Sequence, residues 1–278
     1  MLHRLFLLFF AFLSLSSTQP PKKSLILVSI PPYQEIVEKI GGDHVEVMTI
    51  APPSSDPHTY EPTARQITKL AEGIAWFQIG EPFEKKLSSK LSAKKIDLRK
   101  TVHLLHEEGS FCPSCSHSGE DRHIWLSLKE MEHQADKIQE VLSELLPEHK
   151  AEFQERLAHL KLELALLDVE IKDRLSSLEN RSFVVSHPAF AYFCRDYDLR
   201  QLSVEQEGKE PRPKELEALL EDAKEAHSQI AIAIPQHNNR GTELIAKKLD
   251  LSLHTIDPYS PHYFETLQNL SLALHDSN

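Results

Sequence analysis

Three histidines and one aspartate stand where neighbouring elements would hold a polar side chain firmly. His58 lies in a polar, proline-bracketed stretch, and His123 lies just ahead of an expected helix. His187 and Asp257 each follow an apolar run directly and are followed by proline. Loops at the ends of strands often carry functional side chains, because the sheet fixes their positions. Any one of the 16 histidines could be an ordinary surface residue, but four such positions together predict a shared site.

This set of side chains is typical of a metal site. Three imidazoles and one carboxylate form a borderline-soft, four-ligand set that suits tetrahedral Zn²⁺. Four protein ligands leave no position for an activated water, so we expect a carrier site and no enzyme activity. A zinc hydrolase is an alternative that would need one open position and a general base such as Glu61. Nucleophile elbows, His-Glu-x-x-His motifs and Gly-rich phosphate loops do not occur in the sequence.

The stretch from His103 to His123 is a second place where metal could bind. It carries a possible auxiliary set of ligands, namely His103, His106, Cys112, Cys115 and His117. Cys112 and Cys115 could bind a soft metal weakly, or they could close a small disulfide in an oxidising compartment. Both readings stay open. Cys194 lies on an apolar helix face and is expected to pack as a small hydrophobic residue.

Charge and the N-terminal segment limit the compartment and the partners. With 31 basic and 42 acidic residues, the net charge of −11 argues against nucleic acid or an anionic membrane surface as partner. Residues 1–18 have a basic start, an apolar run from Leu5 to Leu15 and a small-residue exit, the pattern of a secretory signal peptide. The run falls short of the ~20 apolar residues that span a bilayer. We therefore expect a mature chain that is secreted and soluble.

One long helical run, Glu148 to Leu178, divides the chain. Apolar residues recur along it at steps of three and four, which places them on one helix face: Phe153, Leu157, Leu160, Leu164, Leu167, Ile171, Leu175 and Leu178. Pairs of opposite charge four residues apart lie elsewhere on the helix: Glu152 with Arg156, Asp168 with Lys172, and Glu170 with Arg174. At about 1.5 Å per residue the run reaches roughly 45 Å, enough to link two lobes. A coiled coil is the alternative, although the heptad pattern barely exceeds four repeats.

Strand-like and helix-like stretches alternate on both sides of this run. Before it, strands are expected at 24–30, 44–50, 74–79 and 95–98, and helices at 33–40, 63–71, 82–90 and 127–146. After it, strands are expected at 182–186, 199–204, 229–234 and 252–256, and helices at 189–197, 213–227, 242–249 and 261–275. Such alternation predicts α/β lobes with parallel sheets. We predict an N-terminal lobe at 19–147, a linking helix at 148–179 and a C-terminal lobe at 180–278, with the site where strand ends face each other.

Four motifs, in this order, resemble those of a known family. They are Asp56-Pro57-His58-Thr59-Tyr60-Glu61-Pro62, Asp121 to Trp125, Ser186 to Phe193, and Asp257-Pro258. The chain is similar to the periplasmic substrate-binding component of zinc or manganese ABC importers, the cluster A-I family. This resemblance implies two Rossmann-like lobes joined by one long helix.

The resemblance also implies a function and a set of ligands. His58 and His123 from the first lobe, with His187 and Asp257 from the second, would bind a divalent transition metal and deliver it to an ABC permease. A periplasmic monomer is expected. Manganese-specific relatives tend to carry Glu at the position of His187, so zinc is favoured, with Mn²⁺ or Fe²⁺ as alternatives. A metal-dependent adhesion or interaction protein on the same scaffold is a further alternative.

The chain departs from the family pattern at two places. Arg122 puts a positive charge between Asp121 and His123, where relatives have a smaller residue or proline. Ile234 stands where many relatives have an acidic residue before Pro-Gln. His237, close by, could partly substitute for this residue, but the preferred interpretation is an exposed-loop histidine.

Overall fold

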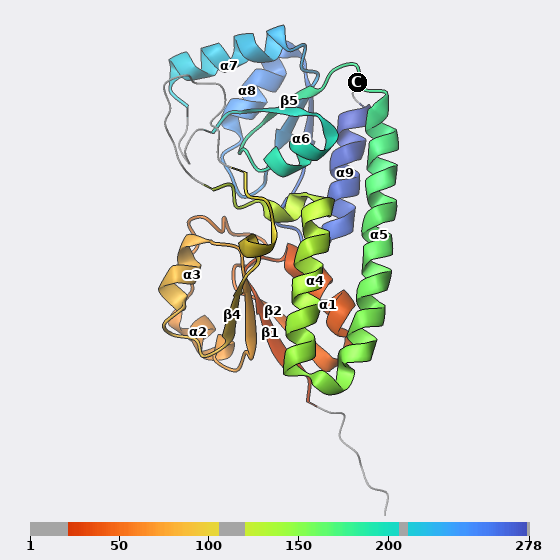
Figure 1. Ribbon diagram of the computed structural model, residues 1–278. Coiled ribbons are helices and arrows are strands. Elements are labelled where there is room, and N and C mark those ends of the chain that lie inside the picture. The colour runs from red at the N-terminus through yellow and green to blue at the C-terminus, as the bar shows by residue number, and fades with distance from the viewer. Residues whose placement is uncertain (1–21, 106–119, 206–210, 277–278) are drawn as a thin grey trace, which may run out of the picture.

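The computed structural model describes residues 22–105, 120–205 and 211–276 and shows two α/β lobes beside one long helix, α5 (Figure 1). The first lobe has a parallel sheet in the order β2-β1-β3-β4. Its strands are β1 (Ser24–Val28), β2 (Val45–Thr49), β3 (Ala75–Gln78) and β4 (Lys94–Asp97), and its helices are α1 (Pro32–Gly41), α2 (Ala64–Leu70), α3 (Pro82–Leu87) and α4 (Leu128–Leu145). The chain therefore reverses direction across the sheet between β1 and β3, which is where open α/β sheets bind ligands.

The second lobe repeats this topology with the order β6-β5-β7-β8, again all parallel. Its strands are β5 (Ser182–Val185), β6 (Arg200–Ser203), β7 (Ile230–Ala233) and β8 (Ser252–Thr255), and its helices are α6 (Ala191–Tyr197), α7 (Pro213–Glu225), α8 (Arg240–Leu249) and α9 (Tyr263–Asp276). The predicted fold of two parallel-sheet lobes and one linking helix is confirmed. Every strand and main helix lies within a few residues of its predicted position.

Helix α5 (Lys150–Ser176) has 27 residues and is about 40 Å long. It is shorter than the predicted run because Pro147–His149 form a separate 3-10 turn, η4. Its predicted apolar face is buried, and its three predicted charge pairs have N···O distances of 2.9, 2.5 and 2.6 Å. The opposite face is exposed and carries apolar residues as well as charged ones, since Leu162, Leu166 and Val169 are more than half exposed.

Helix starts show where side chains fix the local structure. Thr63 and Gln66 cap α2 reciprocally. Ser127 Oγ accepts the Glu130 N–H at 3.0 Å, so α4 is capped too. The Glu130 carboxylate accepts hydrogen bonds from Arg195 and from the backbone of His103.

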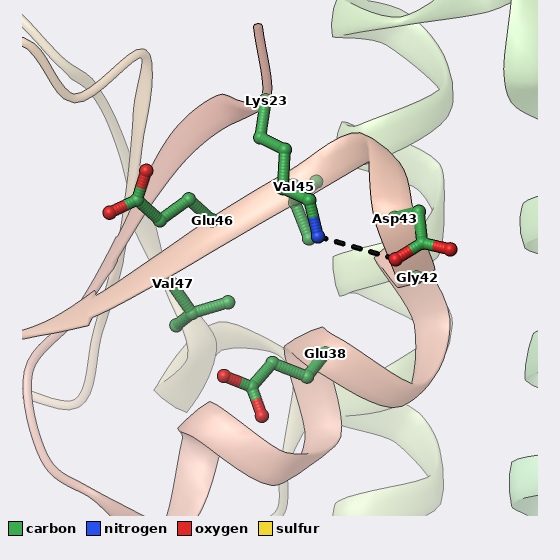
Figure 2. Close-up of a pocket in the computed structure, with 7 residues that line it drawn as sticks. All are labelled: Lys23, Glu38, Gly42, Asp43, Val45, Glu46 and Val47. Carbon is green, nitrogen blue, oxygen red and sulfur yellow. Dashed lines mark hydrogen bonds and ion pairs between the residues drawn. The ribbon is translucent and has the colours of Figure 1, made fainter. Parts of the chain in front are cut away.

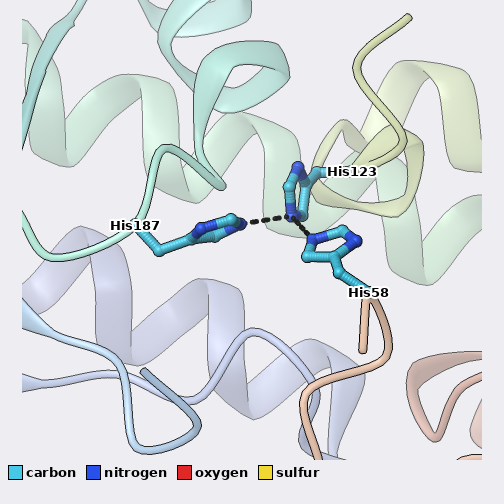
Figure 3. A group of neighbouring side chains, drawn as sticks. All are labelled: His58, His123 and His187. Atoms are coloured by element: carbon cyan, nitrogen blue, oxygen red, sulfur yellow. Dashed lines mark hydrogen bonds between the residues drawn. The ribbon is translucent and has the colours of Figure 1, made fainter. Parts of the chain in front are cut away.

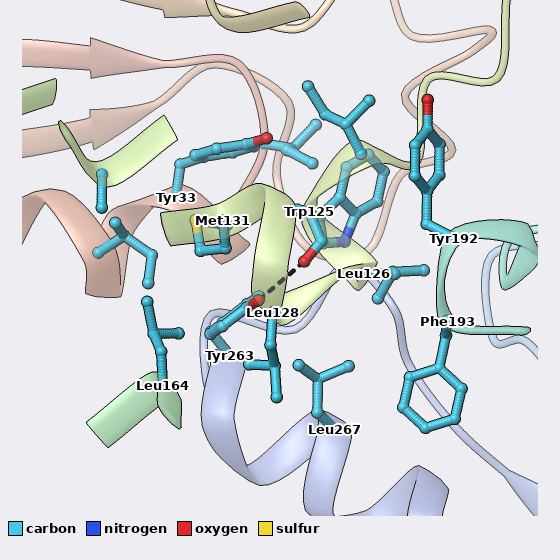
Figure 4. Close-up of a cluster of buried hydrophobic side chains, with 14 of the residues drawn as sticks. Tyr33, Trp125, Leu126, Leu128, Met131, Leu164, Tyr192, Phe193, Tyr263 and Leu267 are labelled. Carbon is cyan, nitrogen blue, oxygen red and sulfur yellow. Dashed lines mark hydrogen bonds between the residues drawn. The ribbon is translucent and has the colours of Figure 1, made fainter. Parts of the chain in front are cut away.

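The main hydrophobic core runs through both lobes and along α5. Figure 4 shows its centre, where Trp125 from the first lobe meets Tyr263 and Leu267 of α9. Tyr263 Oη donates to the Trp125 carbonyl at 2.9 Å, and Trp125 Nε1 donates to the Pro258 carbonyl at 2.9 Å. The Tyr263 N–H donates to Glu35 of α1 at 2.7 Å, at the first residue of α9. The two lobes are thus joined by packing and by hydrogen bonds.

Two predictions lie outside the described residues. They are the signal peptide at 1–18 and the auxiliary ligands His106, Cys112, Cys115 and His117. None of the helices in the described part of the chain combines the length and apolar character that crossing a bilayer requires. Cys194 is buried, as predicted.

Candidate metal centre

His58 is held by the loop between β2 and α2. Its backbone N–H donates to Asp56 Oδ1 at 2.9 Å, an Asx-type turn that fixes the loop. Its ring Nδ1 lies 3.0 Å from Glu81 Oε2. Glu81 is the N-cap residue of α3, just after β3, and its side chain is fully buried. An ionised carboxylate can only accept, so this contact places the proton on Nδ1 of His58 and leaves Nε2 with a free lone pair.

His123 and His187 are held in the same way. Asp121 Oδ1 accepts from the backbone N–H of His123 at 2.8 Å and lies 2.8 Å from its Nδ1. His187 follows β5, and its Nδ1 lies 3.0 Å from Glu205 Oε1, a residue that follows β6. Each of the three histidines therefore has a carboxylate behind its ring. This arrangement orients metal-ligating histidines and raises their basicity.

The three Nε2 atoms converge on one point between the lobes (Figure 3). Nε2 of His123 lies 3.4 Å from Nε2 of His58 and 3.2 Å from Nε2 of His187. In a tetrahedral zinc site with Zn–N bonds of about 2.0–2.1 Å, two ligand nitrogens are about 3.3 Å apart. Lone pairs that face one another at this spacing repel unless a cation lies between them. These two distances therefore fit the spacing of ligand nitrogens in a tetrahedral zinc site.

Burial sets the charge state of the site. Burial lowers the pKa of His123 well below its usual value, and it lowers the pKa of His187 to about 3. For His58, burial lowers the pKa, but the hydrogen bond and charge of Glu81 outweigh this and raise it above the usual value. Two of the three rings are thus held neutral and ready to bind a cation.

The carboxylates behind the rings differ from one another. Burial raises the pKa of Asp121 to about 6. Burial also favours the neutral form of Glu205, but hydrogen bonds to His187 and His237 lower its pKa to about 2. Glu205 is therefore firmly ionised and supplies negative charge beside the site.

Asp257 lies close to this centre but is not part of the histidine group. Its Oδ1 accepts from the Tyr259 N–H and from Gln236 Nε2, both at 2.9 Å. Burial raises its pKa. The Tyr259 hydroxyl lies in the fourth position instead, 3.3 Å from Nε2 of both His58 and His123. The structure thus brings together three of the four predicted ligands, with Tyr259 beside them.

His237 was misread from the sequence. Its side chain is only 6 % exposed, and its ring stacks on His187 with centroids 3.9 Å apart. Its Nδ1 lies 3.0 Å from Glu205 Oε2, and its buried Nε2 has no hydrogen-bond partner. The interpretation as an exposed-loop histidine is wrong, because the loop after β7 folds against Glu205 and His187.

The carboxylates and Tyr259 were missed, although the sequence held a signal for two of them. Glu81 and Glu205 follow strands β3 and β6, the same kind of position that identified His187. Arg122, expected to place a charge near the site, turns its Nε to the Gly80 carbonyl at 2.9 Å. His103 belongs to no cluster of metal-ligand side chains among the residues described.

Two α/β lobes around a shared helix, with histidines from both lobes converging between them, define a two-lobed solute-binding protein with the donor set of a metal centre. Residues 26–276 match the family described as zinc-uptake complex component A, periplasmic, and the chain belongs to this family. It is a family of solute-binding proteins of transporters, and not an enzyme family. Its members are extracytoplasmic or lipoproteins.

Individual relatives agree with this assignment. A provisionally named metal-binding protein of Chlamydia trachomatis is 33% identical over 249 residues, 89% of both chains. The zinc-binding lipoprotein AdcA of Streptococcus pneumoniae is 29% identical over 202 residues, 67% of this chain and 40% of AdcA.

Solved structures show the same fold. The crystal structure of ZnuA superposes with a TM-score of 0.86 at 34% identity, covering 92% of this chain and 100% of that one. A zinc-bound ZnuA deletion mutant gives a TM-score of 0.84 at 35% identity, covering 92% and 98%. The laminin-binding protein Lmb of Streptococcus agalactiae shares the fold. It is 20% identical and superposes with a TM-score of 0.80, covering 91% of this chain and 100% of Lmb.

Proposed function

We propose that this chain captures a divalent transition metal ion outside the cytoplasm and delivers it to an ABC permease. The observation that carries the proposal is the convergence of three Nε2 atoms, each ring being held by a carboxylate at its Nδ1. The metal is the cargo of the protein. The ligands that we propose are His58, His123 and His187, with Asp257 as the fourth.

The fourth ligand requires a local rearrangement. Asp257 must leave Gln236, and its carboxylate must replace the Tyr259 hydroxyl beside His58 and His123. Two features support this step. The Asp257 carboxylate is only two residues from Tyr259, and a neutral phenol is a weaker partner for a cation than a carboxylate.

The donor set favours zinc over the alternatives Mn²⁺ and Fe²⁺. Imidazole nitrogen suits zinc, whereas manganese prefers oxygen ligands. The negative charge that balances the ion comes from Glu81, Asp121 and Glu205, which contact the histidine rings and not the point of convergence. Relatives named for zinc support the same choice.

The remaining proposals concern the location, the oligomeric state, the partners and the absence of enzymatic activity. We propose a periplasmic location, reached through the signal peptide, a monomer, and no nucleic-acid partner, the last on the basis of the net charge of −11. The protein is proposed to have no enzymatic activity. Glu61, the base that a zinc hydrolase would need, is exposed and pairs with Lys86.

Metal counting by mass spectrometry, after dialysis against a chelator of moderate affinity, tests this proposal. The wild-type protein should retain zinc in competition with manganese and iron. The variant in which His58, His123 and His187 are all alanine, called the triple-alanine variant below, should lose this tightly held ion. His133→Ala, which removes an outward histidine of α4, is the matched control and should retain it. A wild-type protein without retained metal at neutral pH, or a triple-alanine variant that keeps it, would contradict the proposal. Host-ligand binding by the wild-type protein that is lost in the triple-alanine variant would favour the alternative of metal-dependent adhesion.

A further inference from the structure

A second group of metal-ligand side chains lies at the other end of the first lobe. His44 ends the 3-10 turn η1 (Gly42–His44), directly before β2, while His149 and Glu152 stand at the start of α5. One ligand atom of each lies within 4.8 Å of the others. Strand β2 runs from His44 towards the loop of His58. This group and the three-histidine site therefore lie at opposite ends of the strands of the first sheet.

The three side chains come from elements that are distant in sequence. Nε2 of His44 lies 2.7 Å from Glu152 Oε2, and Nε2 of His149 lies 3.7 Å from Oε1 of Glu148. His149 and Glu152 are three residues apart at a helix start, a spacing at which two side chains share one helix face. The rings of His44 and His149 are stacked, with centroids 3.5 Å apart and planes 16° apart. Each of the two rings offers one nitrogen atom to the cluster.

The surroundings leave one carboxylate oxygen available. Glu152 Oε1 accepts from Arg156 Nε at 2.9 Å, and Oε2 faces His44. Arg156 can lie here because Gly42, at φ 54°, has no side chain, and a Cβ at this position would come within 2.5 Å of the guanidinium carbon. Arg156 thus weakens the site without closing it.

An open, acidic hollow lies beside the cluster (Figure 2). It is lined by Gly42, Asp43 and Val45, the neighbours of His44, together with Lys23, Glu38, Glu46 and Val47. Lys23 is paired with Asp43 at 3.3 Å, so Glu38 and Glu46 leave the hollow with net negative charge. A cation therefore has a favourable path from solvent towards η1.

We propose that His44, His149 and Glu152 form a second binding site for a borderline divalent cation such as Zn²⁺. Two imidazoles and one carboxylate are a common three-ligand zinc set, in which water completes the tetrahedron. Binding requires the stacked rings to turn apart, which is feasible because the side chains of His44 and His149 are 24% and 31% exposed. Because of this cost and of Arg156, the site is weaker than the three-histidine site.

The experiment measures zinc in the triple-alanine variant, so that its outcome is independent of the function proposed above. Equilibrium dialysis against zinc, without chelator, should show residual binding. Adding His149→Ala should remove about one equivalent of it. Adding His159→Ala, an exposed histidine on the same helix, is the matched control and should change nothing.

The segment 106–119 could also bind zinc, so it needs its own variant. Replacing His106 and His117 by alanine and Cys112 and Cys115 by serine, again in the triple-alanine variant, should leave the equivalent that depends on His149. Circular dichroism confirms that each variant is folded. Residual binding that is absent, or unchanged by His149→Ala, would overturn the proposal.

A second measurement locates the ion directly. In histidine-labelled triple-alanine variant, the imidazole NMR signals of His44 and His149 should shift on zinc addition, while the signal of His159 stays in place. Glu152→Gln should weaken this response and leave the ring signals present. Zinc addition that shifts none of these signals would also overturn the proposal.

Discussion

Glu81 gives the sharpest test of how the site works. Its side chain is fully buried, one oxygen lies 3.0 Å from Nδ1 of His58, and the other, Oε1, has no hydrogen-bond partner. Glu81→Gln keeps the shape of the side chain and removes its charge. Carboxylates behind metal-binding histidines typically account for 10- to 100-fold in affinity, so zinc binding should weaken by about 1.4–2.7 kcal/mol.

The stability of the metal-free protein separates this effect from misfolding. A buried carboxylate with one oxygen unpartnered carries a desolvation cost, so its replacement by an amide should leave the metal-free melting temperature unchanged or higher. At a fixed saturating zinc concentration, the zinc-induced stabilisation should fall by the same amount, about 1.4–2.7 kcal/mol, because ligand binding and folding are linked.

The assay is a competition titration with a chromogenic chelator, together with thermal unfolding with and without zinc. Glu61→Gln, in an exposed residue of the same lobe that pairs with Lys86, is the matched control and should keep wild-type affinity. An affinity of Glu81→Gln within about twofold of the wild type, or a marked fall in metal-free stability, would refute the reasoning.

Three further predictions concern single side chains. Asp257→Ala should weaken zinc binding by more than about tenfold, while Tyr259→Phe should change it by only a few-fold, as read by the same titration; the reverse order would make the hydroxyl the fourth ligand. Phe153→Ala, at a side chain with no exposed surface, should lower the free energy of unfolding by about 3–5 kcal/mol in urea titration, and a loss below about 1 kcal/mol would contradict the packing. Burial raises the pKa of Glu84 from 4.5 to about 7, so the folded protein holds this proton more tightly than the unfolded chain does. The free energy of unfolding should therefore fall by about 3 kcal/mol as pH rises between these two values. Glu84→Gln should flatten this pH profile, and an unaltered slope in the variant would contradict the prediction.

The fold could be predicted because local patterns and tertiary packing agree. The apolar spacing predicted α5 because the residues on that face are buried in the core. The cap at Thr63 fixes the start of α2. Helix α9 begins at Tyr263, two residues later than predicted, where its N–H meets Glu35 of α1. A contact between residues 228 positions apart leaves no local signal in the sequence.

The site was predictable to the extent that its residues follow strands or, as His123 does, lie just ahead of a helix. His58, His123 and His187 were found by position, and the structure brings their rings together. The neighbours of Asp257 were not predictable. Gln236, which follows a different strand of the second lobe, donates a hydrogen bond to Asp257 and another to the Pro53 carbonyl of the first lobe. The partners of each ring depend on such long-range contacts.

Helix α5 packs against α1 and α4 of one lobe and α9 of the other, and the principal core is continuous across them. Neither half can melt without exposing apolar surface of its neighbour. Calorimetry should therefore record a single endotherm for the whole molecule, and a fragment ending before α5 would not be a self-sufficient folding unit.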